Sequence, residues 1–344
     1  MTPTKTLRAK CPTDLLACVP TLLGFHPEHS LVMVTAGKAG VPVHARVDLP
    51  ADPDAHKEIL DIAGGLADVA SRNQVGEVAI VVYALDPFLS TAVGAAMTKV
   101  LAEADVTVLL VISTDGRCWR SHEADGSLRE GDPGTPYELA SHPLTVEAVV
   151  EGRVVHRSRG ALRASLAPID TEVLEAVRHS ADDAADRMLT AAKHPSGPMD
   201  TDAAREHLVA EGRWAQSRVR RFLADQRALD VKDTGRLLVA VLSIEVRDVA
   251  WAEIRRDNCR THVDLWRDVV RRSPSELVAA PAALLAFAAW LAGDGALAWC
   301  AVDRCQEVDS RYSLADLVGQ ALAGAVSPSV WSPLDSADLS LFTG

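Results

Sequence analysis

The sequence predicts an α/β protein, with a mixed sheet and flanking helices in an N-terminal domain and an all-α, helical-repeat-like domain after it. Two continuous apolar runs, residues 78–83 and 106–112, are typical of strands that are covered on both faces. Helix-period patterns separate these runs, and from Thr171 onward such patterns occur almost alone. We therefore expect residues 1–168 to form the mixed α/β domain and residues 169–344 the helical domain.

The first half is expected to contain an opening helix followed by alternating strands and helices. Thr13 and Asp14 can cap the opening helix, which ends at Gly24. Asp115-Gly116 is typical of a two-residue hairpin turn before the last strand. The expected elements are strands 31–35 and 41–49, helix 52–72, strand 78–83, helix 87–104, and strands 106–112 and 117–121.

A polar loop rich in Gly and Pro follows the expected hairpin, at residues 122–136. Thr135 and Glu138 have the spacing of a capping box, and Pro136 stands at the first helical position. We therefore expect a helix to begin at the end of this loop.

The helical half is interrupted at residues 193–198, and an acidic stretch at 200–202 restarts a helix. Residues 284–307 are expected to form two helices joined by a tight Gly-Asp-Gly turn, with a further helix at 312–323. Small residues would let the first two helices approach closely, as in a tetratricopeptide-like pair. These small residues are Ala288, Ala292, Ala296 and Ala301.

Composition and charge exclude several classes of protein. The chain has 344 residues, 48% of them hydrophobic, which excludes a disordered chain and a small disulfide scaffold. With 35 basic and 47 acidic side chains, the formal net charge is −12. Residues 205–272 are a local exception, with 15 basic and 11 acidic side chains. Nucleic-acid binding is therefore disfavoured, with this segment as its only candidate.

The cysteines and the apolar segments favour a cytoplasmic protein without a membrane partner. Six cysteines are too few for a disulfide framework, and none of their spacings is typical of a zinc site. The N-terminus lacks the apolar core of a signal peptide. The most apolar run, residues 278–292, is shorter than the ~20 residues of a membrane span. No motif points to a metal or a cofactor.

The segment His26-Pro27-Glu28-His29 places two imidazoles and a carboxylate between a helix and a strand. One interpretation is a metal or acid–base site at the start of the strand. The other, which we favour, is a loop in which His26 binds the backbone and fixes the entry to the strand.

The expected hairpin presents Asp115, Arg117 and Trp119. Because Arg117 and Trp119 are two residues apart on one strand, they would share a face and could hold an anion and an aromatic group. We favour the alternative, in which Trp119 covers one end of the sheet and Arg117 pairs with an acid.

The loop at residues 131–136 could offer its backbone amides to a phosphate at a helix N-terminus, with Gly134 and Thr135 closest to that helix. It lacks the Gly-Lys-Ser/Thr of a P-loop, so a flexible loop followed by a capped helix is favoured. In the helical half, Arg247 and Asp248 are expected to form a structural ion pair that ties helices together, rather than a catalytic pair.

Several segments together resemble a known family. They are residues 14–34 (DLLACVPTLLGFHPEHSLVMV), Asp115-Gly116-Arg117-Cys118-Trp119, Gly134-Thr135-Pro136, Val246-Arg247-Asp248, Leu265-Trp266 and residues 289–298. Over nearly its whole length, the chain resembles the actinobacterial family of domain of unknown function 4192. The resemblance implies no activity. Members of the family often have a cysteine-containing segment before the Gly-Thr-Pro, but residues 122–133 contain no cysteine here, so no metal or redox role is implied.

Two functions follow as hypotheses. The first is a non-enzymatic adaptor or regulatory protein that binds a protein partner or forms a homo-oligomer, because helical repeats commonly present partner surfaces. The second is a small-molecule-binding protein or enzyme with a pocket on the α/β domain. That pocket would lie near His26, Asp115, Arg117 and the Gly134-Thr135-Pro136 loop, with Asp14 as a further candidate.

Overall fold

The structure is a computed structural model that describes residues 9–36, 43–52, 54–168, 170–191, 201–335 and 339–343. The chain divides into two compact units, which are considered separately below. The first unit comprises Met1–Leu162 with Ala323–Ser329, and the second comprises Arg163–Leu322 with Val330–Gly344.

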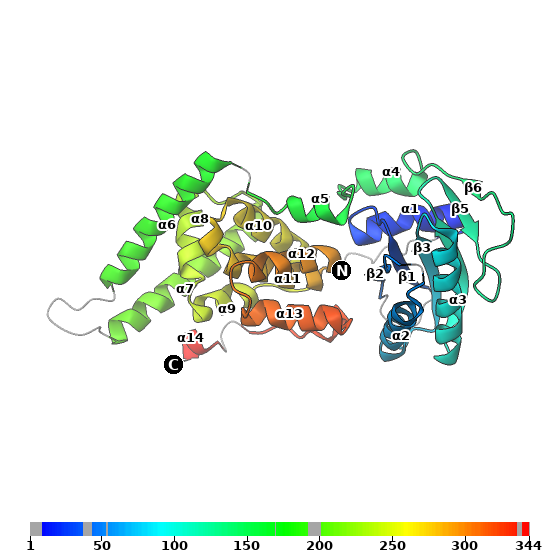
Figure 1. The fold of residues 1–344 in the computed structure, drawn as a ribbon. Helices are drawn as coiled ribbons and strands as arrows, with labels where there is room; N and C mark the ends of the chain where they lie inside the picture. Colours follow the sequence, from blue (N-terminus) through cyan, green and yellow to red (C-terminus); the bar gives the residue numbers. More distant parts are fainter. Residues whose placement is uncertain are drawn as a thin grey trace. The chain divides into compact units, whose positions relative to one another are not determined.

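The first unit contains a mixed sheet, as the sequence predicts (Figure 1). Within the described residues its strands are β1 Ser30–Ala36, β2 Ala45–Asp48, β3 Glu77–Tyr83, β4 Thr107–Thr114, β5 Cys118–Ser121 and β6 Thr135–Pro136. Their order across the sheet is β2-β1-β3-β4-β5-β6. Only the β3–β4 pair is parallel among these neighbours, and the other pairs are antiparallel.

Helices surround the sheet and make up most of the second unit. Those of the first unit are α1 Pro12–Leu23, α2 His56–Arg72, α3 Pro87–Glu103 and α4 Pro143–Val150, and α5 Arg159–Ala164 spans the boundary between the units. Those that follow are α6 Thr171–Ala191, α7 Thr201–Asp225, α8 Val231–Ala240, α9 Ile244–Ala252, α10 Cys259–Arg272, α11 Ala279–Leu291, α12 Gly295–Gln306, α13 Ser313–Ala323 and α14 Ser340–Thr343. Two short 3₁₀ helices lie at Ser275–Leu277 and Pro328–Val330.

The central strands bury side chains on both faces, which explains their continuous apolar sequences. Met33, Ile80 and Val111 are paired across β1, β3 and β4, and they belong to a core cluster with α2 and α3. The next row, Val32, Val81 and Ile112, points to the opposite face and is equally buried. In the view of Figure 1, α1 and α4 lie above the strands, and α2 and α3 lie below or beside them.

The segment after β5 corrects one sequence prediction. The helix expected to begin at Pro136 is absent, and Thr135 and Pro136 form β6 instead, which pairs with β5. Glu138 does not reach back to Thr135, because its carboxylate accepts a hydrogen bond from the amide of Ala140 at 2.8 Å. Pairing with the free edge of β5 satisfies the backbone of this segment, so it overrides the local capping pattern.

Some element boundaries also differ from the expected ones. The helix predicted from residue 52 begins at His56, because Asp52 accepts the amide of Asp54 in a turn before it. The strand predicted at 41–49 is limited to Ala45–Asp48 within the described residues. The predicted interruption at 193–198 lies outside the described residues.

In the second unit, the predicted helices near 284–307 correspond to α11 and α12, which pack against each other. Asp294 begins α12 by accepting the amide of Leu297 at 3.0 Å. Every residue from Ala280 to Leu291 is buried, so α11 is an internal helix. Trp251, Phe287 and Trp331 form an aromatic cluster against it.

A close backbone approach in the first unit requires a glycine within α3. A Cβ atom on Gly94 would lie 2.5 Å from the carbonyl oxygen of Gly126, and it would also meet the ring of His122. The imidazole of His122 is itself held by the same carbonyl, with 2.6 Å between Nδ1 and oxygen. The loop that follows β5 is thereby packed against α3.

We predict that Gly94→Ala destabilises the protein by about 1–3 kcal/mol, because the added methyl group must displace backbone. Gly64→Ala in α2 is the matched control, because a Cβ there meets no atom within 4 Å. It should stabilise the helix by up to about 1 kcal/mol. Urea unfolding of both variants measures the difference, and equal stabilities would contradict the close approach.

Candidate functional site

Asp115 holds the turn between β4 and β5. Its carboxylate accepts the backbone amides of Arg117 at 2.9 Å and Cys118 at 2.8 Å, and Arg120 approaches it at 3.3 Å. Burial alone would raise the pKa of Asp115, but the two amides and the Arg120 guanidinium outweigh burial, so the pKa is lowered. Asp115 is therefore a structural anion in this turn.

Arg117 and Trp119 lie on the same hairpin but differ in exposure. Arg117 is exposed and precedes β5, and its carbonyl accepts the amide of Tyr137 at 3.1 Å. Trp119 lies within β5, opposite Thr114 and Thr135, and is partly buried. The arginine that pairs with Asp115 is therefore Arg120 rather than Arg117.

Gly134 and Thr135 join the same hairpin from the other side. The amide of Gly134 donates to the Asp132 carboxylate at 2.8 Å, and Thr135 pairs with Trp119 in the sheet. Because a strand follows Gly134, the helix N-terminus required by the phosphate hypothesis is absent here. The phosphate hypothesis therefore started from a wrong premise. The loop instead leads into β6 at the edge of the sheet.

His26 and Glu28 occupy a different loop, before β1. Both side chains are exposed, and the amide of His26 donates to the carbonyl of His156 at 2.9 Å. The histidine whose ring binds the backbone is His29, whose Nε2 lies 3.1 Å from the carbonyl oxygen of Pro50. The strand entry is thus fixed by the backbone around His26 and by the ring of His29.

Asp14 connects two helices. Its carboxylate accepts the amide of Lys10 at 2.8 Å and lies 3.2 Å from Nε2 of His142, the residue before α4. The Lys10 amide is the largest cause of the lowered pKa of Asp14. Among the residues that the structure describes, no hydrogen bond or ion pair joins Asp14, His26 and Arg117.

The carboxyl ends of the parallel strands present a set of polar residues that the sequence did not single out. Ser30, Tyr83 and Thr114 are paired in one row across β1, β3 and β4. The hydroxyls of Thr114 and Tyr137 lie 2.9 Å apart, and Arg46 donates to Ser30 at 2.7 Å. Ligands often bind at this edge of an open α/β sheet. Ser30 and Thr114 already have these partners, whereas the buried Tyr83 hydroxyl has none among the described residues, so the row is largely structural.

Arg247 and Asp248 form an ion pair on α9, with a distance of 2.6 Å between Nη2 and Oδ1. Arg247 is buried, and its guanidinium lies 5.4 Å from the centre of the Tyr312 ring. The pair therefore connects α9 to the segment that precedes α13, which is a structural arrangement.

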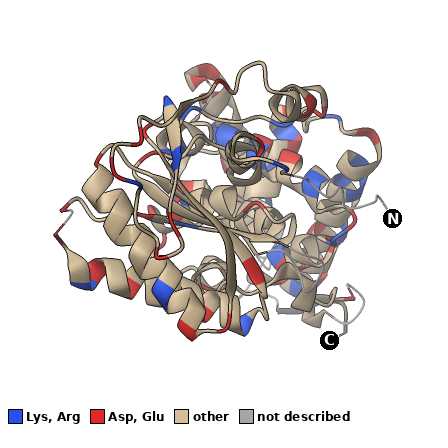
Figure 2. Ribbon diagram, turned by 90° about the vertical axis from the view of Figure 1, so that its right-hand side faces the viewer, with Lys and Arg blue, Asp and Glu red and all other residues tan. Residues whose placement is uncertain are grey.

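The arginine-rich segment at 205–272 is interleaved with acids. Arg218 and Arg221 both lie 3.5 Å from Asp233, and Arg220 lies 2.8 Å from Glu253. Figure 2 shows Lys and Arg interspersed with Asp and Glu along the ribbon. These ion pairs reduce the positive field that a nucleic acid would require.

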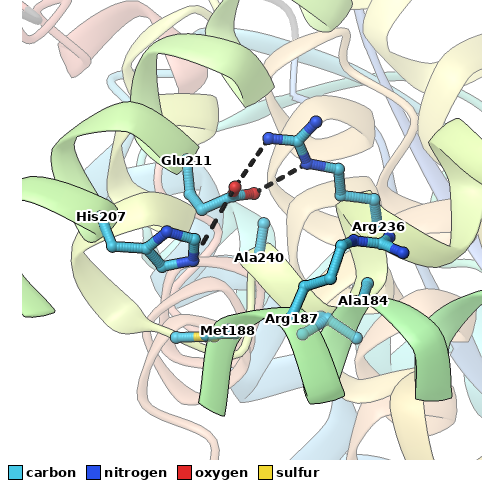
Figure 3. Close-up of a pocket in the computed structure, with 8 residues that line it drawn as sticks. Ala184, Arg187, Met188, His207, Glu211, Arg236 and Ala240 are labelled. Carbon is cyan, nitrogen blue, oxygen red and sulfur yellow. Dashed lines mark hydrogen bonds and ion pairs between the residues drawn. The ribbon is translucent and has the colours of Figure 1, made fainter. Parts of the chain in front are cut away.

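A pocket of about 190 Å³ lies among α6, α7 and α8 of the second unit (Figure 3). The sequence prediction did not include it. Its polar lining consists of Arg187, His207, Glu211 and Arg236, and its apolar lining of Ala184, Met188, Val239 and Ala240. No local motif marks this pocket, because its residues come from three helices.

A second polar cluster in this unit surrounds the buried His262 and reaches the surface at Arg220. His262 is buried, and its Nε2 lies 3.0 Å from the carbonyl oxygen of Glu253. The Glu253 carboxylate binds Arg220 and Gln216 at 2.8 Å each. Burial is the largest influence on His262 and lowers its pKa to about 4, so the ring is neutral at pH 7.

The cysteines and the acidic side chains form no metal centre within the described ranges. There, no group of three or more His, Cys, Asp or Glu side chains is arranged to hold a metal ion. All six cysteines are free thiols. Burial raises the pKa of Cys18 to about 11 and that of Cys305 to about 12, so these thiols stay protonated at pH 7. No described helix is both long and apolar enough to cross a bilayer.

These features define a mixed α/β protein that combines a sheet, six-stranded within the described residues, with many helices. Residues 12–329 match the family described as Domain of unknown function (DUF4192), and the chain belongs to this family. The resemblance drawn from the sequence motifs is thereby confirmed. Neither a curated protein nor a solved structure matches the chain.

We predict that the buried His262 makes stability depend on pH between about 6.5 and 4. In that window the histidine is protonated in the unfolded chain but stays neutral in the folded protein. The free energy of unfolding is therefore highest above pH 6.5 and decreases as the pH is lowered toward 4. Between pH 7 and pH 5 the loss should be about 2 kcal/mol. Urea unfolding, followed by tryptophan fluorescence, measures this loss.

His262→Gln should remove that part of the pH dependence, because the amide can still donate to the Glu253 carbonyl but does not titrate. His179→Gln is the control, because the His179 side chain is 83% exposed. A parent-like pH dependence in His262→Gln would contradict the assignment.

Proposed function

We propose that this protein is a non-enzymatic cytoplasmic adaptor that binds a different protein, and that its two compact units act as an N-terminal α/β domain and a C-terminal helical domain. The main support is an apolar stripe on α4. The free thiols favour a reducing compartment such as the cytoplasm. The actinobacterial origin implied by the sequence resemblance is part of the same proposal.

The apolar stripe comprises Val146, Val149 and Val150 of α4, with Val154 shortly after the helix. Their side chains lie on the solvent side, with 49%, 67%, 82% and 65% of the residue surface exposed, respectively. Positions 146, 149 and 150 are spaced i, i+3 and i+4, so they share one face of the helix. The buried residue of α4 is Ala148, on its other side.

An exposed apolar stripe of this kind lowers the solubility of the protein unless a partner covers it. Soluble monomers seldom expose several adjacent large aliphatic side chains, and such patches often mark interaction sites. α1 packs against the other side of α4, where Ala148 lies beside Cys18 and Thr21, and Asp14 of α1 pairs with His142 just before the helix. The helix is thus a fixed platform for a partner with a complementary apolar face.

Self-association is the less favoured explanation of the stripe. The chain has a formal net charge of −12, and two copies would repel each other. Glu147 and Glu151 are not part of the stripe, because they line a small pocket with Cys18 and Thr21 of α1 on the other side of α4. A partner with basic residues around an apolar patch would complement this acidic chain better than a second copy would.

The enzyme alternative draws less support from the described residues. Asp115 is engaged by two amides and Arg120, and the amide of Gly134 is engaged by Asp132. His26 and Arg117 are exposed, and no hydrogen bond or ion pair joins them within the described chain. A catalytic group would need a nucleophile or base positioned beside a donor, and these residues do not form such a set.

We predict that Val149→Asp combined with Val150→Asp weakens capture of the partner at least about tenfold, because it places two charges in the apolar interface. The tagged full-length chain is captured from its own cells after mild crosslinking. Quantitative mass spectrometry then measures the amount of partner protein bound to it. Stability should change by less than about 0.5 kcal/mol, because both side chains are exposed.

Leu60→Asp is the matched control, because Leu60 is an apolar residue of α2 with half of its surface exposed. It should capture the same partner as the parent chain. Equal capture by the α4 variant and the control would contradict the proposal. A crosslinked species that contains only this chain would replace the adaptor proposal with self-association.

A further inference from the structure

The pocket among α6, α7 and α8 combines a charged wall with an apolar wall. Figure 3 shows His207 and Glu211 extending from one helix and Arg236 from another, with Arg187 reaching up from below. Ala184, Met188, Val239 and Ala240 complete the lining with apolar atoms. A cavity of about 190 Å³ is large enough for a small molecule of several non-hydrogen atoms.

The acidic residue of this lining is already neutralised. Glu211 is buried, and Arg236 binds its two carboxylate oxygens at 2.7 and 3.1 Å. Trp214 fixes the same guanidinium from one side, since its ring centre lies 4.1 Å from Cζ of Arg236. His207 lies 3.9 Å from the Glu211 carboxylate. Arg236 is therefore held in one orientation before any ligand binds.

Arg187 supplies the charge that remains. Within the described part of the chain, its guanidinium has no hydrogen-bond or ion-pair partner, and it lines the same pocket as Arg236. Arg187, Arg236 and Glu211 together carry one net positive charge. One uncompensated guanidinium matches a single negative charge on a ligand.

We infer that this pocket binds a small organic monoanion, namely a short aliphatic carboxylate. The carboxylate would be held by Arg187, with Arg236 beside it, and the alkyl group would lie against the apolar wall that includes Met188 and Val239. Guanidinium groups match carboxylates in a bidentate geometry, and the short apolar wall fits a few methylene groups. This site is separate from the stripe on α4 and does not depend on the adaptor proposal.

Butyrate is the probe, and Met188 is the reporter. The full-length chain labelled at its methionine methyl groups should show a saturable shift of the Met188 resonance, with a Kd of about 1 mM. Met33 and Met97 are buried in the first unit, so their resonances should not move. Met188→Leu assigns the reporting resonance.

Butyramide is the matched neutral ligand, and it should bind at least about tenfold more weakly, because it has no charge to pair with the guanidinium. Arg187→Gln should weaken butyrate binding by a similar factor. Arg213→Gln is the control variant, because Arg213 is an exposed arginine of α7 outside the pocket lining.

Three results would overturn the inference. The first is no Met188 shift with butyrate up to about 50 mM. The second is a failure of either matched comparison: butyrate and butyramide bind equally well, or Arg187→Gln and Arg213→Gln bind butyrate equally well. The third is tighter binding of inorganic phosphate than of butyrate, because it would assign the pocket to a phosphate group instead.

Discussion

Burial of the central strands on both faces is the constraint on which the first unit depends. Ile80, Val81 and Val82 are consecutive in β3 and fully buried. Since alternate side chains point in opposite directions, such a run requires apolar cover above and below the sheet. The helices α2 and α3 cover one face of the sheet. The chain therefore returns to the sheet after each of these helices.

This constraint also determines which residues gather at the edge of the sheet. The parallel pair β3–β4, connected through α3, places Tyr83 and Thr114 side by side at their carboxyl ends. The chain then turns at Asp115 and adds β5 and β6 as short antiparallel strands. The hydrogen-bond capacity of that edge is mostly used to hold the hairpin. The two surfaces that we propose for other molecules lie elsewhere, on α4 and among α6, α7 and α8.

The sequence predicts features that depend on local pattern. The runs at 78–83 and 106–112 indicate strands because their apolar residues are continuous. Asp115-Gly116 indicates a turn because glycine readily adopts a positive φ, and Gly116 has a φ of 87° in the structure. The helix expected at Pro136 fails because pairing with β5, a contact between distant residues, outweighs a local capping pattern.

The sites are harder to predict for the same reason. Arg187, His207 and Arg236 are separated by about 20 to 30 residues along the chain, and only the packing of three helices brings them to one pocket. In the sequence alone, the valines of the α4 stripe cannot be distinguished from the buried residues of an ordinary apolar helix. Its exposure depends on which face α1 covers, and that is a property of the tertiary structure.

Native mass spectrometry of the full-length protein, purified gently from its own cells, tests the adaptor proposal most directly. We expect a mass equal to this chain plus a second, different protein. A single-chain mass, with or without a retained small molecule, would contradict the proposal. In that case the exposed stripe on α4 would need another explanation.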